Sequence, residues 1–154
     1  MVSTGRGPSF AMRSRRASTI GGRVSRRSSP FPNVARRKRF VSVATYRRSG
    51  AAVATPLWFG WTDRGIAIVT PANAAKVKRL GRDSRVTVAP CRGQGRVTGP
   101  TAPARARILS GAEATAALQA IARRYPVPRF MLESTMRRRA GGLDPIYIEI
   151  TPGD

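Results

Sequence analysis

Two tight turns divide residues 40–70 into three β-rich runs, and no other feature of the sequence constrains the fold as strongly. The first run is FVSVATY (40–46), the second AAVATPLWFGW (51–61) and the third IAIVT (66–70), and the segments RRSG and TDRG separate them. Short glycine-containing turns between runs of this kind are typical of β-hairpins. Residues 40–70 are therefore predicted to form an antiparallel meander.

The remainder of the chain alternates between further strand and helix patterns. Strands are predicted at residues 84–91, 102–110 and 145–151, and helices at 73–82, 111–125 and 129–139. Six short strands with helices inserted late favour a mainly β (α+β) fold, a six-stranded antiparallel barrel that is closed or split, with two or three short helices. A chain of 154 residues suits one such domain.

The charge of the chain is extreme and unevenly distributed. The sequence has 29 Lys and Arg residues against 7 Asp and Glu residues, a formal net charge of +22. Residues 1–39 carry eleven of the cations and no acid, so about half of the excess lies in this segment. Such a charge predicts attraction to polyanions, which include nucleic acid, acidic membranes and phosphorylated ligands.

The amino-terminal segment lacks any hydrophobic period. Arg, Ser, Gly and Pro dominate residues 1–37, and such a composition cannot bury enough apolar surface to offset chain entropy. We therefore expect a disordered basic tail at 1–37, followed by one domain at 38–154. The tail resembles a transit peptide, and it also suits a nucleic-acid-binding arm or a translated extension upstream of the functional start. We favour the upstream extension.

The side chains that most often perform acid–base catalysis are scarce. The chain has no histidine, its single cysteine is Cys91, and its seven acids are scattered without the spacing of a metal or glycosidase site. If the protein is an enzyme, its catalytic side chains are unknown and a bound cofactor would have to carry the reaction. No apolar run approaches the ~18 residues of a transmembrane helix, so we expect a cytoplasmic protein with no membrane partner.

The segment VTPANAAKVKRL (69–80) combines a helix pattern with a group of cations. On a helix that begins at Asn73, Lys76 and Arg79 lie three residues apart on one flank, and Lys78 lies on the other side. The free backbone N–H groups of a helix amino terminus bind anions readily. The segment is therefore either an anion site or an ordinary solvated basic face.

A proline interrupts the second predicted strand. Pro56 removes one hydrogen bond of the strand ladder, which implies an edge, a bulge or a place where a flat ligand lies against the backbone. Trp58 shares the face of Pro56, whereas Leu57 and Phe59 point the opposite way. Trp58 could stack on a ligand ring or belong to the core.

Three segments in this order resemble a known family. VATPLWF, VTPANAAKVKRLGRDSRVTVAPC and GRVTGP are similar to the pyridoxamine 5'-phosphate oxidase-like flavin/deazaflavin oxidoreductases, and most similar to the actinobacterial branch that uses the deazaflavin coenzyme F420. The resemblance covers Phe40 to Pro152. It implies a split β-barrel of the FMN-binding type, a homodimer with the cofactor groove at the subunit interface, and hydride transfer to an electrophilic small-molecule substrate.

The same resemblance assigns cofactor-binding residues. The side chains near the ring would be Thr55, Pro56 and Trp58, and those near the phosphate-bearing tail would be Thr70, Asn73, Lys76, Lys78 and Arg79. The chain departs from its relatives at Asn73-Ala74, where they often carry Asp-Ser, so one possible hydroxyl donor to the phosphate is lost.

Other functions remain open. The nearest alternative is the same fold with FMN in place of coenzyme F420, and a barrel that carries the cofactor without activity is another. A basic nucleic-acid-binding protein would fit the charge, but the aromatic residues are few and no nucleic-acid-binding motif is present.

Overall fold

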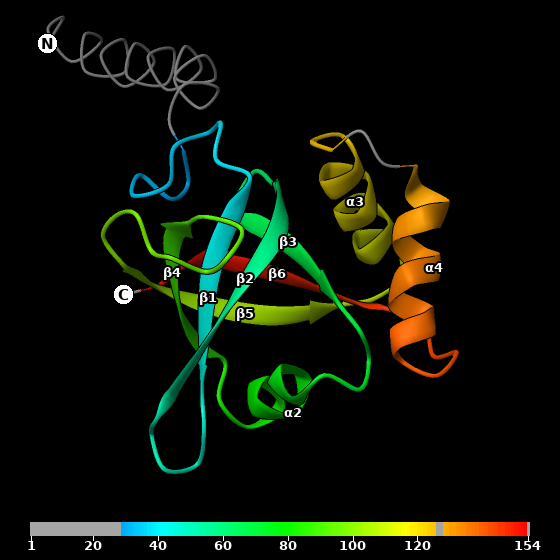
Figure 1. The fold of residues 1–154 in the computed structure, drawn as a ribbon, viewed down its shortest axis with the longest axis horizontal. Helices are drawn as coiled ribbons and strands as arrows, with labels where there is room; N and C mark the ends of the chain where they lie inside the picture. Colours follow the sequence, from blue (N-terminus) through cyan, green and yellow to red (C-terminus); the bar gives the residue numbers. More distant parts are fainter. Residues whose placement is uncertain (1–28, 126–127, 154) are drawn as a thin grey trace, which may run out of the picture.

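The computed structural model describes residues 29–125 and 128–153, and within them six strands close into an antiparallel barrel (Figure 1). Around the barrel the strands follow the order β1-β2-β3-β6-β5-β4. Their bounds are β1 (Phe40–Tyr46), β2 (Ala52–Trp61), β3 (Ile66–Thr70), β4 (Arg85–Cys91), β5 (Ala102–Leu109) and β6 (Ile146–Pro152). The predicted six-stranded antiparallel split barrel is thus confirmed, and its strand bounds lie within one residue of the predicted ones.

The described residues also contain the three predicted helices. They are α2 (Ala75–Arg82), α3 (Gly111–Ala122) and α4 (Arg129–Arg139). Figure 1 shows α3 and α4 side by side along one flank of the barrel, with α2 at one end of it. The predicted helix at 111–125 is too long, because α3 ends at Ala122 and residues 123–125 form a turn and a bend.

The predicted meander forms because its turns place glycine where the backbone requires it. Gly50 ends the β1–β2 turn with φ of 91°, a conformation that residues with a Cβ rarely adopt. The register then pairs Phe40 with Trp58 and Tyr46 with Ala52. This register sets which side chains of β2 face the barrel interior and which face outward.

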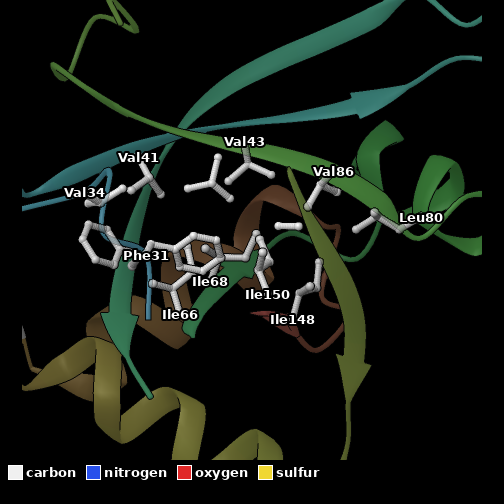
Figure 2. Packing of buried hydrophobic residues seen from close by; sticks show 13 residues of the cluster. Phe31, Val34, Val41, Val43, Ile66, Ile68, Leu80, Val86, Ile148 and Ile150 are labelled. Carbon is white, nitrogen blue, oxygen red and sulfur yellow. The ribbon is translucent and has the colours of Figure 1, made fainter. Parts of the chain in front are cut away.

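The barrel interior is filled by apolar side chains that alternate along the strands (Figure 2). Phe31 and Val34 lie at one end of this row of side chains, and Leu80 of α2 lies at the other. We call this set the interior cluster, and its buried members are Phe31, Val34, Val41, Val43, Phe59, Ile66, Ile68, Leu80, Val86, Val88, Ala104, Ile148 and Ile150. Cys91 is also buried, at 2% exposure, as expected of a small apolar residue.

The expected tail at 1–37 is too long at its carboxyl end. Phe31 and Val34 are each only 1% exposed, and Asn33 Nδ2 donates to the carbonyl oxygens of Val88 and Pro100, at 2.9 Å each. Residues 29–37 therefore belong to the packed domain, because their two apolar side chains close one end of the barrel. The part of the expected tail at residues 1–28 lies outside the described residues.

Helix α3 packs closely against β2. A Cβ added to Gly60 would lie 2.4 Å from the carbonyl carbon of Ala120, so only glycine permits this approach. Beyond the helix, the Tyr125 hydroxyl accepts a hydrogen bond from the Phe59 N–H at 3.1 Å and donates to the Arg39 carbonyl. These contacts hold the outer layer of the fold in place on the barrel.

A second group of apolar side chains fills the space between the barrel and the helices α3 and α4. We call it the outer cluster, and its buried members are Ala67, Val69, Leu109, Ala117, Leu118, Ile121, Tyr125, Leu132 and Tyr147. Trp58 and Met136 are partly buried against it.

Candidate functional site

A pocket of about 410 Å³ lies between β2 and α4, at the edge of the outer cluster. Its lining residues are Phe40, Pro56, Leu57, Trp58, Val69, Met131, Leu132, Thr135, Met136 and Arg139. Its volume is within the range of small-molecule sites, and its wall is mostly apolar with a few polar groups, as such sites usually are. Arg139 supplies the ionisable side chain of this lining.

Two of the residues predicted near the cofactor ring, Pro56 and Trp58, line this pocket. They lie in the part of β2 that pairs with β1 alone, because β2 meets β3 only from Phe59 onward. Pro56 thus lies where β2 is an edge on one side, one of the environments that a strand proline predicts.

Trp58 is both a pocket wall and a packing residue. Its ring stacks on Tyr125 with 4.2 Å between the ring centroids and 6° between the planes. Tyr125 itself is buried, so the stack joins the pocket wall to the outer cluster. The interpretation of Trp58 as a packing residue is therefore supported, and its contact with a ligand ring stays a prediction.

Helix α4 supplies half of the pocket lining, and sequence reasoning did not assign it to the site. Met131 and Thr135 lie four residues apart, as do Leu132 and Met136, so these side chains share one side of the helix. That spacing is visible in the sequence. What the sequence lacked was any indication that this side of α4 faces Pro56 and Trp58 on a distant strand.

The cations of α2 form a group with two buried threonines. Lys76 Nζ lies 3.4 Å from Thr70 Oγ1, and Arg79 Nε donates to Thr45 Oγ1 at 2.6 Å. Burial lowers the pKa of Lys76, and the nearby charge of Arg79 lowers it further. An anion placed beside Lys76 would oppose both effects, because it would stabilise the charged ammonium.

This basic group adjoins the pocket through two short links. Val69 lines the pocket and directly precedes Thr70 on β3. Asn73 Nδ2 donates to the carbonyl oxygen of Arg139, another lining residue, at 3.3 Å. The structure thus brings Pro56, Trp58 and four of the predicted tail-binding residues into one region, namely Thr70, Asn73, Lys76 and Arg79.

Two predicted site residues lie apart from this region. Thr55 pairs with Val43, whose side chain is in the interior cluster, and it does not line the pocket. Lys78 is exposed on the surface of α2.

The amino terminus of α2 has no side-chain cap. Ala74 occupies the N-cap position with extended backbone angles, φ of −67° and ψ of 141°, and it has no side-chain oxygen that could accept a hydrogen bond. The first N–H groups of α2 therefore lack the partner that a serine, threonine or aspartate would supply.

The sequence of the chain identifies its family. Residues 33–140 match the family described as pyridoxamine 5'-phosphate oxidase. The chain belongs to this family. The match includes the strands β1 to β5, all three described helices and every predicted cofactor-binding residue.

Solved structures share the fold of this family member at low sequence identity. The haem storage protein HutZ of Vibrio cholerae is 11% identical with a TM-score of 0.58, and the alignment covers 76% of this chain and 83% of HutZ. A conserved hypothetical protein of Mycobacterium tuberculosis is 21% identical with a TM-score of 0.56, covering 75% and 74%. An F420-H2 dependent reductase is 18% identical with a TM-score of 0.50, covering 72% and 93%. No curated protein matches the sequence.

Two further features are absent from the described residues of this family member. None of their helices has the length and apolar character needed to cross a membrane. Nor do they hold three His, Cys, Asp or Glu side chains close enough together to bind a metal ion. The pocket can instead hold a flat ring against Trp58, and the adjoining cations can hold an attached anionic group. The Trp58 wall and the adjoining cations together fit a cofactor that joins a ring to a phosphate-bearing chain.

Proposed function

We propose that this protein is an oxidoreductase that binds coenzyme F420 and acts on an electrophilic small molecule. In the proposed arrangement Pro56 and Trp58 lie beside the ring, and Thr70, Asn73, Lys76 and Arg79 hold the phosphate-bearing tail. Lys78, which is exposed at the side of this group, adds to the positive potential that attracts the tail. The observation that carries the proposal is the apolar pocket with the half-buried Lys76 group beside it.

The residues of the chain would position the reactants, and the cofactor would supply the hydride chemistry when bound. Trp58 is held by its stack on Tyr125 and so provides a fixed wall for a ring. Lys76 and Arg79 provide charge-assisted contacts to anionic oxygens. The apolar side chains of α4 would exclude water from the ring, which strengthens the polar contacts around it.

We further propose that the protein forms a homodimer with the cofactor groove at the subunit interface. On α4, which forms one wall of the pocket, Phe130 is 67% exposed and Met131 50% exposed. A second copy of the chain packed over this helix would cover both side chains and narrow the opening of the pocket. Sedimentation of the purified protein would test this arrangement.

The identity of the cofactor is tested by titrating the protein with coenzyme F420 and, separately, with FMN. Binding is monitored through Trp fluorescence and ligand absorbance. FMN is the second candidate, because the family match does not discriminate between the two ligands. Haemin is a useful third ligand, since HutZ has the same fold. The chain has no histidine, a common axial ligand of haem iron, so we expect haemin to bind more weakly.

Lys76→Ala should weaken binding of coenzyme F420 by about ten- to a hundredfold, the value of one or two charge-assisted hydrogen bonds. The affinity should fall as salt rises, and it should also fall at alkaline pH, because anion binding needs the protonated amine whose pKa burial has lowered. Arg123→Ala is the matched control, since Arg123 is an exposed cation at the end of α3 that does not line the pocket beside α4, and its side chain donates to the Gln119 carbonyl. Unchanged affinity in Lys76→Ala would contradict the proposal.

A further inference from the structure

A second pocket, larger than the one beside α4, lies at the end of the barrel near the β1–β2 turn. Its volume is about 620 Å³, and the two pockets have no lining residue in common. The β1–β2 turn, the end of α2, the start of β4 and the start of β5 form its walls. It is lined by Tyr46, Arg47, Arg48, Gly50, Arg82, Asp83, Arg85, Val86, Thr87, Pro103, Ala104, Arg105 and Gly153. We call it the arginine pocket.

Asp83, the acid in this lining, is already engaged by one arginine. Arg85 donates from Nε to Oδ1 of Asp83 at 3.0 Å and from Nη2 to Oδ2 at 2.9 Å. These hydrogen bonds lower the pKa of Asp83 to about 2, so its carboxylate stays ionised and bound to Arg85. Among the described residues no carboxylate lies within ion-pair distance of the other four arginines in the lining, Arg47, Arg48, Arg82 and Arg105.

Arg105 donates to the Ser84 hydroxyl at 3.3 Å, but this partner is neutral. The lack of carboxylate partners contrasts with the other end of β5. There Arg107 contacts Glu113 at 2.8 Å and Glu149 at 2.9 Å, and Arg64 also reaches Glu149 at 2.9 Å. Each of these two arginines therefore lies beside at least one carboxylate. The lining of the arginine pocket, by contrast, contains five arginines and a single carboxylate, that of Asp83.

A bound anion would relieve the repulsion among these arginines, because each guanidinium would gain a partner of opposite charge. A planar guanidinium presents pairs of N–H groups that match two oxygens of one phosphate, and this geometry distinguishes arginine from lysine. All the cations that line the pocket are arginines. Several guanidinium groups around one pocket suit a ligand with more than one phosphate group.

The shape of the pocket favours a compact ligand. Its volume lies within the range of about 300–1,000 Å³ that is usual for small-molecule sites. The backbone of a nucleic-acid duplex is an extended, convex surface and would meet a basic stripe rather than enter a hollow. The buried side chains of Val86 and Ala104 lie in the lining, and the half-buried ring of Tyr46 stands at one wall.

We propose that the arginine pocket binds a small molecule that carries linked phosphate groups, either an inorganic oligophosphate or a nucleoside polyphosphate. The proposal does not depend on the cofactor assigned to the pocket beside α4. The shared chemistry of the two sources is the phosphate chain, which the four arginines without an ion-paired carboxylate would hold. A base, where present, would contact Tyr46.

The test is calorimetric titration of the full chain with inorganic tripolyphosphate and, separately, with ATP, at about 0.15 M salt to screen diffuse attraction. The variant is Arg48→Ala with Arg82→Ala, which removes two unpaired arginines from the lining. The matched control is Arg92→Ala with Arg138→Ala, which removes the same charge from exposed arginines outside both pockets. We expect one tripolyphosphate per chain, about a hundredfold weaker binding in the variant, and nearly unchanged binding in the control.

The two sources of phosphate are distinguished by comparing the ligands. ATP that binds more tightly than tripolyphosphate, with the difference lost in Tyr46→Ala, would assign a nucleoside polyphosphate. Equal affinities would assign an inorganic oligophosphate.

Three results would overturn the proposal. Equal losses in the variant and the control would show that the anion is attracted by net charge alone. Loss of tripolyphosphate binding in Lys76→Ala, but not in the arginine variant, would place the anion in the basic group of α2. Binding of a single-stranded oligonucleotide through these arginines, without binding of either small phosphate, would identify a nucleic-acid surface instead. Thermal melting of each variant confirms that the fold is kept.

Discussion

The interior cluster and the outer cluster are both apolar, but they are closed to different degrees. Inside the barrel, all six strands supply side chains, Phe31 and Val34 close one end, and Leu80 closes the other. Between the barrel and the helices, α3 is packed closely against β2 at Gly60, whereas α4 leaves the pocket of about 410 Å³ beside Trp58. The interior cluster is thus packed from end to end, whereas the outer layer leaves a pocket open beside α4.

This difference has a physical cause. A strand in a barrel is held by neighbours on both sides, so its inward side chains have little freedom to separate. A helix on the outer face is held by one side only, and α4 adds one buried side chain, Leu132, to the outer cluster, with Met136 partly buried beside it. Mutations in the two clusters should therefore affect different properties of the protein.

The largest expected effect concerns the closure of the interior. Phe31→Ala should lower the free energy of unfolding by about 3–5 kcal/mol, because it removes a fully buried ring and leaves a cavity. Urea denaturation measures this change. A chain shortened to begin at Ser29 should unfold like the full chain, because residues 1–28 lack a hydrophobic period. If Phe31→Ala were as stable as the parent, the amino-terminal segment would not belong to the interior.

An intermediate effect is expected at the boundary between the clusters. Trp58→Ala should lower stability by about 1–3 kcal/mol through loss of the stack on Tyr125, and it should also weaken ring binding by a similar free energy. Denaturation and cofactor titration on the same variant measure the two losses.

Trp61→Ala is the matched control for Trp58→Ala. Trp61 packs against the interior cluster and does not line the pocket beside α4. This variant should therefore lose stability while it keeps its affinity for the cofactor. Equal losses of affinity in both variants would mean that general loosening of the barrel, and not the pocket wall, governs binding.

The smallest expected effect is a gain at the end of the barrel that α2 closes. Ala74→Ser places a hydroxyl at the N-cap of α2, where the backbone is already extended, and should raise stability by about 0.5–1 kcal/mol. Ala72→Ser, which lies outside the helix, should have no such effect. Thermal melting at matched concentration measures both, and no gain in Ala74→Ser would show that formation of α2 does not limit the stability of the interior.

Much of the fold could be predicted because strands and turns are determined by residues that are close together in the sequence. The alternation in FVSVATY and IAIVT, and the turns that end in Gly50 and Gly65, determine strands and hairpins within a few neighbouring residues. The packing of Leu57 and Phe59 against the interior cluster and the packing of Trp58 against the outer cluster follow from the same period. The failure at residues 29–37 has the same origin, because Phe31 and Val34 are isolated apolar residues in a polar segment and show no period.

The candidate site was predictable only in part. The cations of α2 and the two residues of β2 were identified by resemblance, and the structure places them near one another with the exception of Lys78 and Thr55. The contribution of α4 and the arginine pocket was not identified. Arg48, Arg82 and Arg105 are separated along the chain by whole elements, and nothing in their spacing indicates that they surround one hollow.

The sequence by itself determined the strands, the helices, the order in which they occur and the large excess of positive charge. Only the tertiary structure decided that Trp58 stacks on Tyr125, that Asn73 reaches the backbone of α4, and that four arginines surround a hollow without carboxylate partners. The reason is that periodicity and turn chemistry act between neighbours in the chain, whereas a pocket is formed by distant segments that meet only when the barrel closes and its hydrophobic faces are buried.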